Sequence, residues 1–259
     1  MGNHISIQNL EKPSKQALFI AGKMAKELQS RVSVRYKSEN QPVTDADIQI
    51  NNYLMDFFSK LTPEFGWLSE ESHDDKSRLH SDYFWCLDPI DGTKSYIDGK
   101  PEYTISLALI KKSQPILGMI INPETNEFFY ARKNNGAFCN SKKIVVNKKK
   151  KLNLCTYAIS SSELKKLSKY NFLKDLKVIK MGSIAYKIAL VAKGKVDIAI
   201  SFTKKNDWDL AAANLILNES GGKVEELFGK EIIYNSEDLK INSVLASNEV
   251  IISELRKKL

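Results

Sequence analysis

Two aspartates in a turn-forming segment are the strongest candidates for functional residues in this sequence. Asp88 and Asp91 stand in "DPIDGT", directly after the apolar run of residues 83–87. Two like charges held close together repel, and the repulsion grows as water is removed. Pro89 is unfavourable inside a strand and Gly92 tolerates unusual backbone angles, so the segment predicts a sharp turn that leaves the strand end. Both carboxylates would then face one space, where a cation could compensate them.

An anion site is expected beside these carboxylates. A short helix can begin at Thr93, which would leave the N–H groups of Gly92 and Thr93 free to bind a phosphate. Carboxylates beside such amides need a cation between them and the anion. Mg²⁺ fits best, since it is a hard ion that takes oxygen ligands from one or two carboxylates and from substrate phosphates.

Three further acidic segments are ambiguous when each is taken alone. Glu70 and Glu71 in "LSEES" could form an exposed acidic turn. Asp47 in "VTDAD" has capping-box spacing from Thr44. Asp209 in "NDWDLAAA" occupies the expected N-cap of an amphipathic helix. Each segment thus has a structural explanation as well as a catalytic one.

The elements that would position these residues fall into two lobes. Apolar periodicity predicts helices over residues 14–29 and from near residue 44 to 61. Residues 65–138 consist of short apolar runs between turn segments, which predicts an antiparallel meander. After residue 153, strand and helix patterns alternate. We therefore expect an α+β lobe over 14–150 and a βα-alternating lobe over 151–259.

The composition of the chain limits which partners and which cellular compartment are expected for it. The 259 residues carry a formal net charge of +8, which suits a nucleic acid, an anionic membrane or a phosphorylated substrate. The basic run at 147–151 has no interleaved aromatics and predicts a surface loop, so no nucleic-acid partner is expected. No apolar run approaches the roughly 18 residues of a membrane span, so no stable membrane association is expected. The three cysteines form no metal or complete disulfide pattern, which suits a reducing cytoplasm.

The acidic segments together resemble one family. "VTDAD", "SEES", "DPIDGTKSY" and "DWDLAAANLILNESGG" occur in the order and approximate spacing of the inositol monophosphatase-like family of Mg²⁺-dependent, lithium-sensitive phosphomonoesterases. The resemblance extends from about Ser14 to Glu249. It implies a layered αβαβα sandwich, two or three Mg²⁺ per site, a homodimer, and hydrolysis of a small phosphate ester by metal-activated water.

The resemblance also implies roles for individual residues. A first metal would be held by Glu70, Asp88, Thr93 and the Ile90 carbonyl, and a second by Asp88, Asp91 and Asp209. Glu70 and Thr93 would flank the attacking water, with Asp47 orienting the Thr93 hydroxyl. The substrate side would comprise the Gly92 and Thr93 amides together with Lys37, Gly182, Ser183 and Asp209.

The substrate is less well defined by the sequence. "GTKSYIDGKPEYT" and the "SEE" that replaces the family's usual "GEE" are similar to the branch that removes the 3′-phosphate from adenosine 3′,5′-bisphosphate. A 3′(2′),5′-bisphosphate nucleotidase is therefore the favoured interpretation. The alternatives are an inositol-1-monophosphatase and then a histidinol-phosphatase. A non-catalytic anion-binding protein is the alternative of a different class.

Overall fold

Two long helices form the outer layer of the N-terminal half. The computed structural model describes residues 6–39, 41–167 and 177–258. Helix α1 spans Ile7–Gln29 and α2 spans Asp45–Leu61. Helix α1 begins earlier than its apolar periodicity predicted and continues through Pro13, because Leu10 in the added turns is buried against the core. A two-stranded hairpin, β1 (Val34–Ser38) and β2 (Gln41–Thr44), joins the helices.

The second layer is a seven-stranded sheet, named the central sheet here because helices cover both of its faces. Its strands, in spatial order, are β3 (Gly66–Ser69), β4 (Tyr83–Asp91), β5 (Thr104–Lys111), β6 (Gln114–Asn122), β7 (Glu127–Arg132), β8 (Ala137–Cys139) and β9 (Lys142–Ile144). The predicted antiparallel meander is confirmed from β4 to β8, and β9 extends it beyond the predicted range. It is wrong for β3, which pairs parallel to β4. The crossover that parallel pairing requires contains a short 3-10 helix, η1 (Ser77–His80).

Strand β4 does not end where the sequence predicted. It continues through Pro89 to Asp91, with a shift in its register against β5 between Asp88 and Asp91. A proline is tolerated at such an irregularity because the ladder hydrogen bond it would lack is already interrupted there. The expected sharp turn is therefore a bulged strand end. The short helix α3 (Thr93–Ile97) follows Gly92, as predicted.

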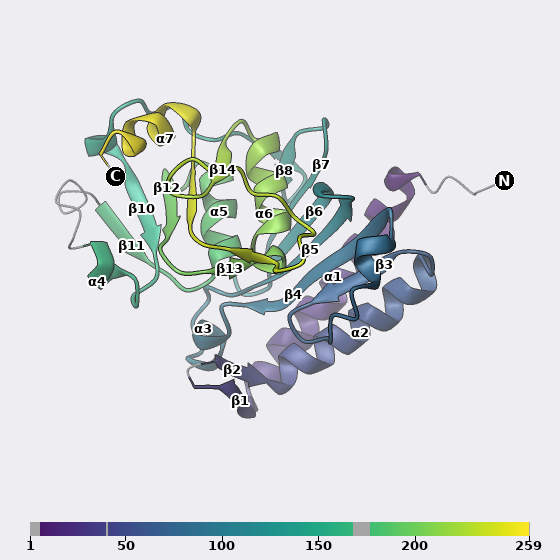
Figure 1. The fold of residues 1–259 in the computed structure, drawn as a ribbon. Helices are drawn as coiled ribbons and strands as arrows, with labels where there is room; N and C mark the ends of the chain where they lie inside the picture. The colour runs from purple at the N-terminus through teal and green to yellow at the C-terminus, as the bar shows by residue number, and fades with distance from the viewer. Residues whose placement is uncertain (1–5, 40, 168–176, 259) are drawn as a thin grey trace.

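Two helices separate the central sheet from a second sheet. Helices α5 (Ile184–Ala192) and α6 (Asp207–Glu219) lie between them in Figure 1. The second sheet has the order β11 (Lys177–Lys180), β10 (Thr156–Ile159), β12 (Ile198–Ser201), β16 (Val244–Ser247) and β14 (Lys223–Glu225). Helix α7 (Glu249–Arg256), which the sequence did not predict, covers its outer side. These layers confirm the expected αβαβα sandwich.

The remaining elements are short. They are η2 (Leu152–Leu154), α4 (Leu164–Leu167) and the two-stranded pair of β13 (Lys205–Asn206) and β15 (Lys240–Ile241). Among the described residues, no helix is both long and apolar enough to cross a membrane. The division into domains at residue 150 stays a prediction, since α5 and α6 pack against both large sheets.

The double coverage of the central sheet explains the apolar run before Asp88. Trp85 and Leu87 pack with α1 and α2, whereas Phe84 and Cys86 pack with α5 and α6. A strand buried on both faces needs a continuous apolar sequence rather than an alternating one. Cys86 is accordingly a free, buried core residue. The layers thereby hold the end of β4, with its two aspartates, rigidly beside the start of α6.

Candidate metal and phosphate site

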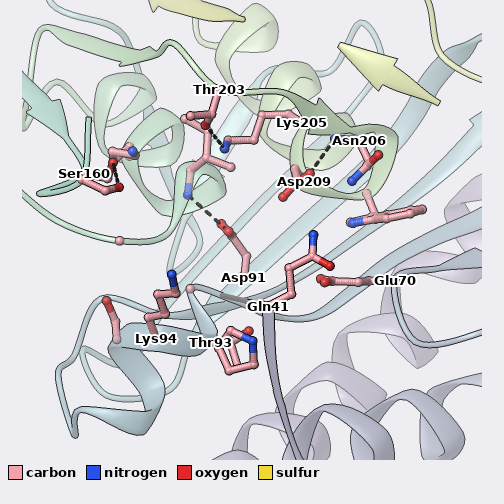
Figure 2. A pocket seen from close by; sticks show the side chains of 18 of the residues that line it. Gln41, Glu70, Asp91, Thr93, Lys94, Ser160, Thr203, Lys205, Asn206 and Asp209 are labelled. Carbon is pink, nitrogen blue, oxygen red and sulfur yellow. Dashed lines mark hydrogen bonds between the residues drawn. The ribbon is translucent and has the colours of Figure 1, made fainter. Parts of the chain in front are cut away.

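Three carboxylates converge where β4 meets α6. Asp88 and Asp91 come from the end of β4, and Asp209 comes from the first turn of α6. One carboxylate oxygen from each lies within 4.8 Å of the other two. Figure 2 shows Asp91 and Asp209 pointing into a common space, with Glu70 facing the same space from just beyond the end of β3. The structure thus brings together side chains that are far apart in the sequence.

Asp88 makes no ion pair among the described residues. It is 1% exposed, and the hydrogen bond it accepts comes from the backbone N–H of Ile90, at 3.1 Å. Burial, reinforced by the charges of Glu70, Asp91 and Asp209, raises the pKa of Asp88 well above its ordinary value. An ionised Asp88 therefore requires a nearby cation.

The other two carboxylates are partly satisfied by hydrogen bonds. Asp91 accepts bonds from the Ser183 hydroxyl and from the N–H of Ala185, at 2.6 Å, yet burial still raises its pKa. Asp209 accepts the Asn206 N–H at 2.6 Å, and burial raises its pKa to about 7. Asn206 is the N-cap of α6, so the expected capping position of Asp209 is wrong: its side chain reaches back to close a capping box.

This donor set fits a divalent cation. Three clustered carboxylates supply hard oxygen ligands, and bringing a doubly positive ion among them would remove the repulsion that raises their pKa values. The carbonyl of Ile90 lies beside them and accepts the Thr93 hydroxyl at 3.1 Å. The predicted ligands at the end of β4 are thus neighbours, and their metal-binding roles stay predictions.

Glu70 has a cationic partner on the hairpin. Its backbone N–H donates to the Leu87 carbonyl, which ties the end of β3 to β4. Lys37 of β1 donates to Glu70 at 3.3 Å and also to Glu71. Burial lowers the pKa of Lys37, but the two glutamates outweigh it and the net change is upward. The predicted substrate-side lysine is therefore paired with acidic residues in the structure.

Asp47 makes a different contact from the expected one. Its carboxylate accepts the backbone N–H of Thr44 at 2.7 Å and the Thr44 hydroxyl at 2.5 Å, which completes the capping box of α2. The hydroxyl of Thr93 donates to Ile90 instead. The expectation that Asp47 orients the Thr93 hydroxyl therefore stays a prediction, because in this structure the Asp47 carboxylate closes the capping box with the N-cap residue Thr44. Burial raises the pKa of Asp47 to about 7.

The start of α3 needs glycine. Gly92 has a φ of +99°, and a Cβ there would lie 2.9 Å from the Glu102 carbonyl oxygen. The N–H groups of the first helical turn have no acceptor within the helix, so they are available to an anion. Gly182 approaches the same region closely, since a Cβ there would lie 2.4 Å from Ser95 Oγ. These two close approaches place the Gly182 and Ser183 loop beside the predicted phosphate position.

A cavity of about 440 Å³ opens above the carboxylates. The predicted residues that line it are Lys37, Glu70, Asp91, Gly92, Thr93, Gly182 and Asp209. Sequence reasoning missed Lys187, Glu163 and Thr203, which line it together with Lys205. A signal for Lys187 was present, because it is the single charged residue in the otherwise apolar helix "IAYKIALVA".

Comparisons with known proteins agree with this arrangement. The model of the inositol monophosphatase family matches residues 6–259. A Thermotoga maritima fructose-1,6-bisphosphatase/inositol-1-monophosphatase is 30% identical over 215 residues, covering 81% of this chain and 80% of the relative. A Haemophilus influenzae 3′(2′),5′-bisphosphate nucleotidase CysQ is 30% identical over 241 residues, covering 88% and 89%. A Mesorhizobium japonicum inositol-1-monophosphatase is 30% identical over 234 residues, covering 87% and 85%.

Solved structures agree as well. A Thermotoga maritima IMPase superposes with a TM-score of 0.84 at 30% identity, covering 94% of both chains. A Bartonella henselae extragenic suppressor protein suhB gives a TM-score of 0.85 at 25% identity, covering 96% of this chain and 98% of that one. The layered fold and the carboxylate cluster define a phosphatase that hydrolyses phosphate monoesters. The chain belongs to the inositol monophosphatase family.

Proposed function

We propose that this phosphatase is Mg²⁺-dependent and acts on a small substrate with two phosphate groups, in the first place a nucleoside 3′(2′),5′-bisphosphate. The observation that carries the proposal is a buried ammonium in the carboxylate-lined cavity: Lys187 lines it and is 1% exposed. When one phosphate group of the substrate is held over the carboxylates, the Lys187 ammonium is still available to bind a second anionic group. The relatives do not choose between substrates, since nucleotidases and inositol phosphatases match equally well.

The chain's own residues provide the metal sites and the phosphate cradle. Glu70, Asp88, Thr93 and the Ile90 carbonyl would hold one Mg²⁺, and Asp88, Asp91 and Asp209 a second. When bound, Mg²⁺ supplies Lewis-acid chemistry that neutralises charge on the phosphoryl and leaving oxygens. The first-turn amides of α3 would bind the phosphate oxygens, which positions phosphorus toward Glu70 and Thr93.

Proton movement is assigned to two residues. Burial raises the pKa of Glu70 from its ordinary value, which makes its carboxylate a better proton acceptor than an exposed one. The Thr93 hydroxyl, held at 3.1 Å from the Ile90 carbonyl, lies at the start of α3 and would orient the attacking water together with Glu70. No side-chain nucleophile is needed for this hydrolysis.

The second anion would be bound by the inner wall of the cavity. Among the described residues, the Lys187 ammonium makes neither an ion pair nor a hydrogen bond. Glu163 faces it, but that carboxylate already accepts the Ser201 hydroxyl at 2.6 Å and the Phe202 N–H at 2.8 Å. Lys205, whose ammonium donates to Thr203 at 2.9 Å, adds a second positive charge to the same wall. A dianionic group fits such a surface better than the neutral ring of a polyol.

Phosphate release with Mg²⁺ tests the substrate. The panel comprises adenosine 3′,5′-bisphosphate, inositol 1-phosphate, histidinol phosphate and fructose 1,6-bisphosphate. We expect the highest kcat/KM for the nucleoside bisphosphate, and Lys187→Met should lower that value more than the value for inositol 1-phosphate. The inositol-1-monophosphatase alternative, then the histidinol-phosphatase, replaces the proposal if its substrate has the highest value. The non-catalytic alternative predicts no release from any substrate together with salt-sensitive anion binding.

The homodimer remains a proposal from the family resemblance. Light scattering of the purified chain across a concentration series measures its mass directly. A mass near twice the 29.3 kDa of one chain supports the dimer.

A further inference from the structure

A buried arginine connects the two halves of the molecule close to the carboxylate cluster. Arg78 lies in η1, between β3 and β4, and is 0% exposed. Its Nη1 donates to Asn235 Oδ1 at 2.6 Å, and its Nη2 donates to the Ser236 carbonyl at 3.1 Å. Asn235 and Ser236 belong to the segment between β14 and β15 of the other half. One guanidinium group therefore holds a distant segment in place.

The same segment is also hydrogen-bonded to the start of α6. The backbone N–H of Asn235 donates to Asp207 Oδ2 at 2.6 Å. Asp207 is the first residue of α6 and is 0% exposed. Asp209 lies in the same helical turn, so a shift of Asp207 moves the Asp209 carboxylate with it.

The rest of the arginine is also satisfied. Its Nε donates to Asp74 Oδ1 at 3.1 Å, and its Nη2 donates to Asp74 Oδ2 at 2.9 Å. Asp74 belongs to the crossover between β3 and β4, which begins at Glu70. The network thus spans from the crossover next to Glu70 to the start of α6, and each link is a short, directional hydrogen bond.

The location of the network matters because Asp209 is the one predicted metal ligand that lies after residue 150. The others, Glu70, Asp88, Ile90, Asp91 and Thr93, all precede it. The second metal position is therefore completed only when the two halves hold a fixed relation. Van der Waals packing of α6 on the sheet sets the distance between the layers, and hydrogen bonds fix position along the helix axis more strictly.

We propose that Arg78 and Asn235 are positioning residues that fix the start of α6 and so hold Asp209 against Asp88 and Asp91. The inference rests on the proposed metal site, and it adds a determinant of metal affinity that touches neither metal nor substrate. Partners behind metal ligands typically change affinity about 10- to 100-fold when they are removed.

Two variants separate positioning from folding. Asn235 has a φ of +64°, so Asn235→Gly removes the amide side chain while keeping that backbone conformation and the N–H that bonds Asp207. Arg78→Lys keeps the positive charge but loses the fork of donors. The matched control is Arg256→Lys, since Arg256 also bonds a buried carboxylate, Glu225, but does so on α7.

Mn²⁺ binding to the full chain, measured by electron paramagnetic resonance without substrate, is the direct readout. We expect one Mn²⁺ site, the position that includes Asp209, to lose affinity about 10-fold in Asn235→Gly and more in Arg78→Lys, with the other site unchanged. Arg256→Lys should bind Mn²⁺ as the wild type does, even with a lower melting temperature. If Arg78→Lys fails to fold, Asn235→Gly decides alone.

Two results overturn the inference. Wild-type affinities in Asn235→Gly show that the network does not position Asp209, while the proposed metal site stands. Absence of Mn²⁺ binding in the wild-type chain overturns the metal site itself, and the positioning role with it.

Discussion

Asp209 brings a carboxylate oxygen within 4.8 Å of one from Asp88, although the two residues belong to different layers of the sandwich. Asp88 is 1% exposed, and its pKa is raised by burial and by the neighbouring acidic charges. The fold therefore holds an electrostatically unfavourable cluster in place by packing. Residues kept in such a conflict contribute to function at a cost in stability.

The first prediction concerns Asp88→Asn. The variant should lose Mg²⁺-dependent turnover by at least about 100-fold, because a carboxylate shared by both proposed metals is lost. Its melting temperature in EDTA should equal or exceed that of the wild type, because a repulsion is relieved. Differential scanning calorimetry and phosphate release measure the two effects.

The control is Asp197→Asn, since Asp197 is buried but bonded by Lys149 and by the Thr156 N–H. That change should lower the melting temperature and keep turnover. Wild-type turnover in Asp88→Asn would refute the ligand assignment.

The second prediction is that divalent cations stabilise the folded chain. Mg²⁺ binds the assembled carboxylates and not the dispersed ones of the unfolded chain, so the melting temperature should rise with its concentration. An excess of about 100 times the dissociation constant corresponds to about 2.7 kcal/mol. Ca²⁺ should stabilise as well but support little turnover, because it tolerates irregular coordination. Equal rates with the two ions would contradict the proposed role of the metal.

Much of the site was predictable because its signals are local. The spacing of Asp88 and Asp91 next to Gly92, and the acidic residue before the α6 apolar pattern, follow from backbone rules within a few residues. The two lobes followed from periodicity, and the layered sandwich followed from the family resemblance. Their agreement with the structure reflects consistency between local preference and tertiary packing.

The features that sequence reasoning missed depend on tertiary contacts. Lys187 lies within an apolar helix, and its position in the cavity follows from the packing of α5 between two sheets. The passage of β4 through Pro89 depends on its pairing with β5. The parallel direction of β3 depends on the crossover between β3 and β4, whose sequence shows no helix or strand pattern. Each requires knowledge of which elements are neighbours.

The third prediction uses the pH dependence of Lys187. Burial lowers the pKa of its ammonium from 10.5 to about 8, with Glu163 acting in the opposite direction. The kcat/KM for adenosine 3′,5′-bisphosphate should therefore fall as the pH rises through about 8, while that for inositol 1-phosphate should not share this step. Because the unfolded chain binds the proton more tightly, the free energy of unfolding should rise with pH between about 8 and 10.5.

Two variants check the assignment of that step. Lys187→Met should remove it from the bisphosphate profile. Lys195→Met, which removes one charge at an exposed position just beyond α5, should retain it. The same step in both variants would assign the titration to another group.

The fourth prediction is that salt distinguishes the substrates. The chain carries a net charge of +8, and its cavity wall includes Lys187 and Lys205, so a bisphosphate should be attracted more strongly than a monophosphate. The Debye length shortens from about 10 Å at 0.1 M ionic strength to about 3 Å at 1 M, which screens the more highly charged ligand most. Raising the ionic strength at fixed Mg²⁺ activity should therefore lower kcat/KM more for adenosine 3′,5′-bisphosphate than for inositol 1-phosphate. Initial rates at subsaturating substrate measure this ratio directly. If the two values fall in parallel, and inositol 1-phosphate has the higher kcat/KM at low salt, the inositol-1-monophosphatase interpretation replaces the bisphosphate one.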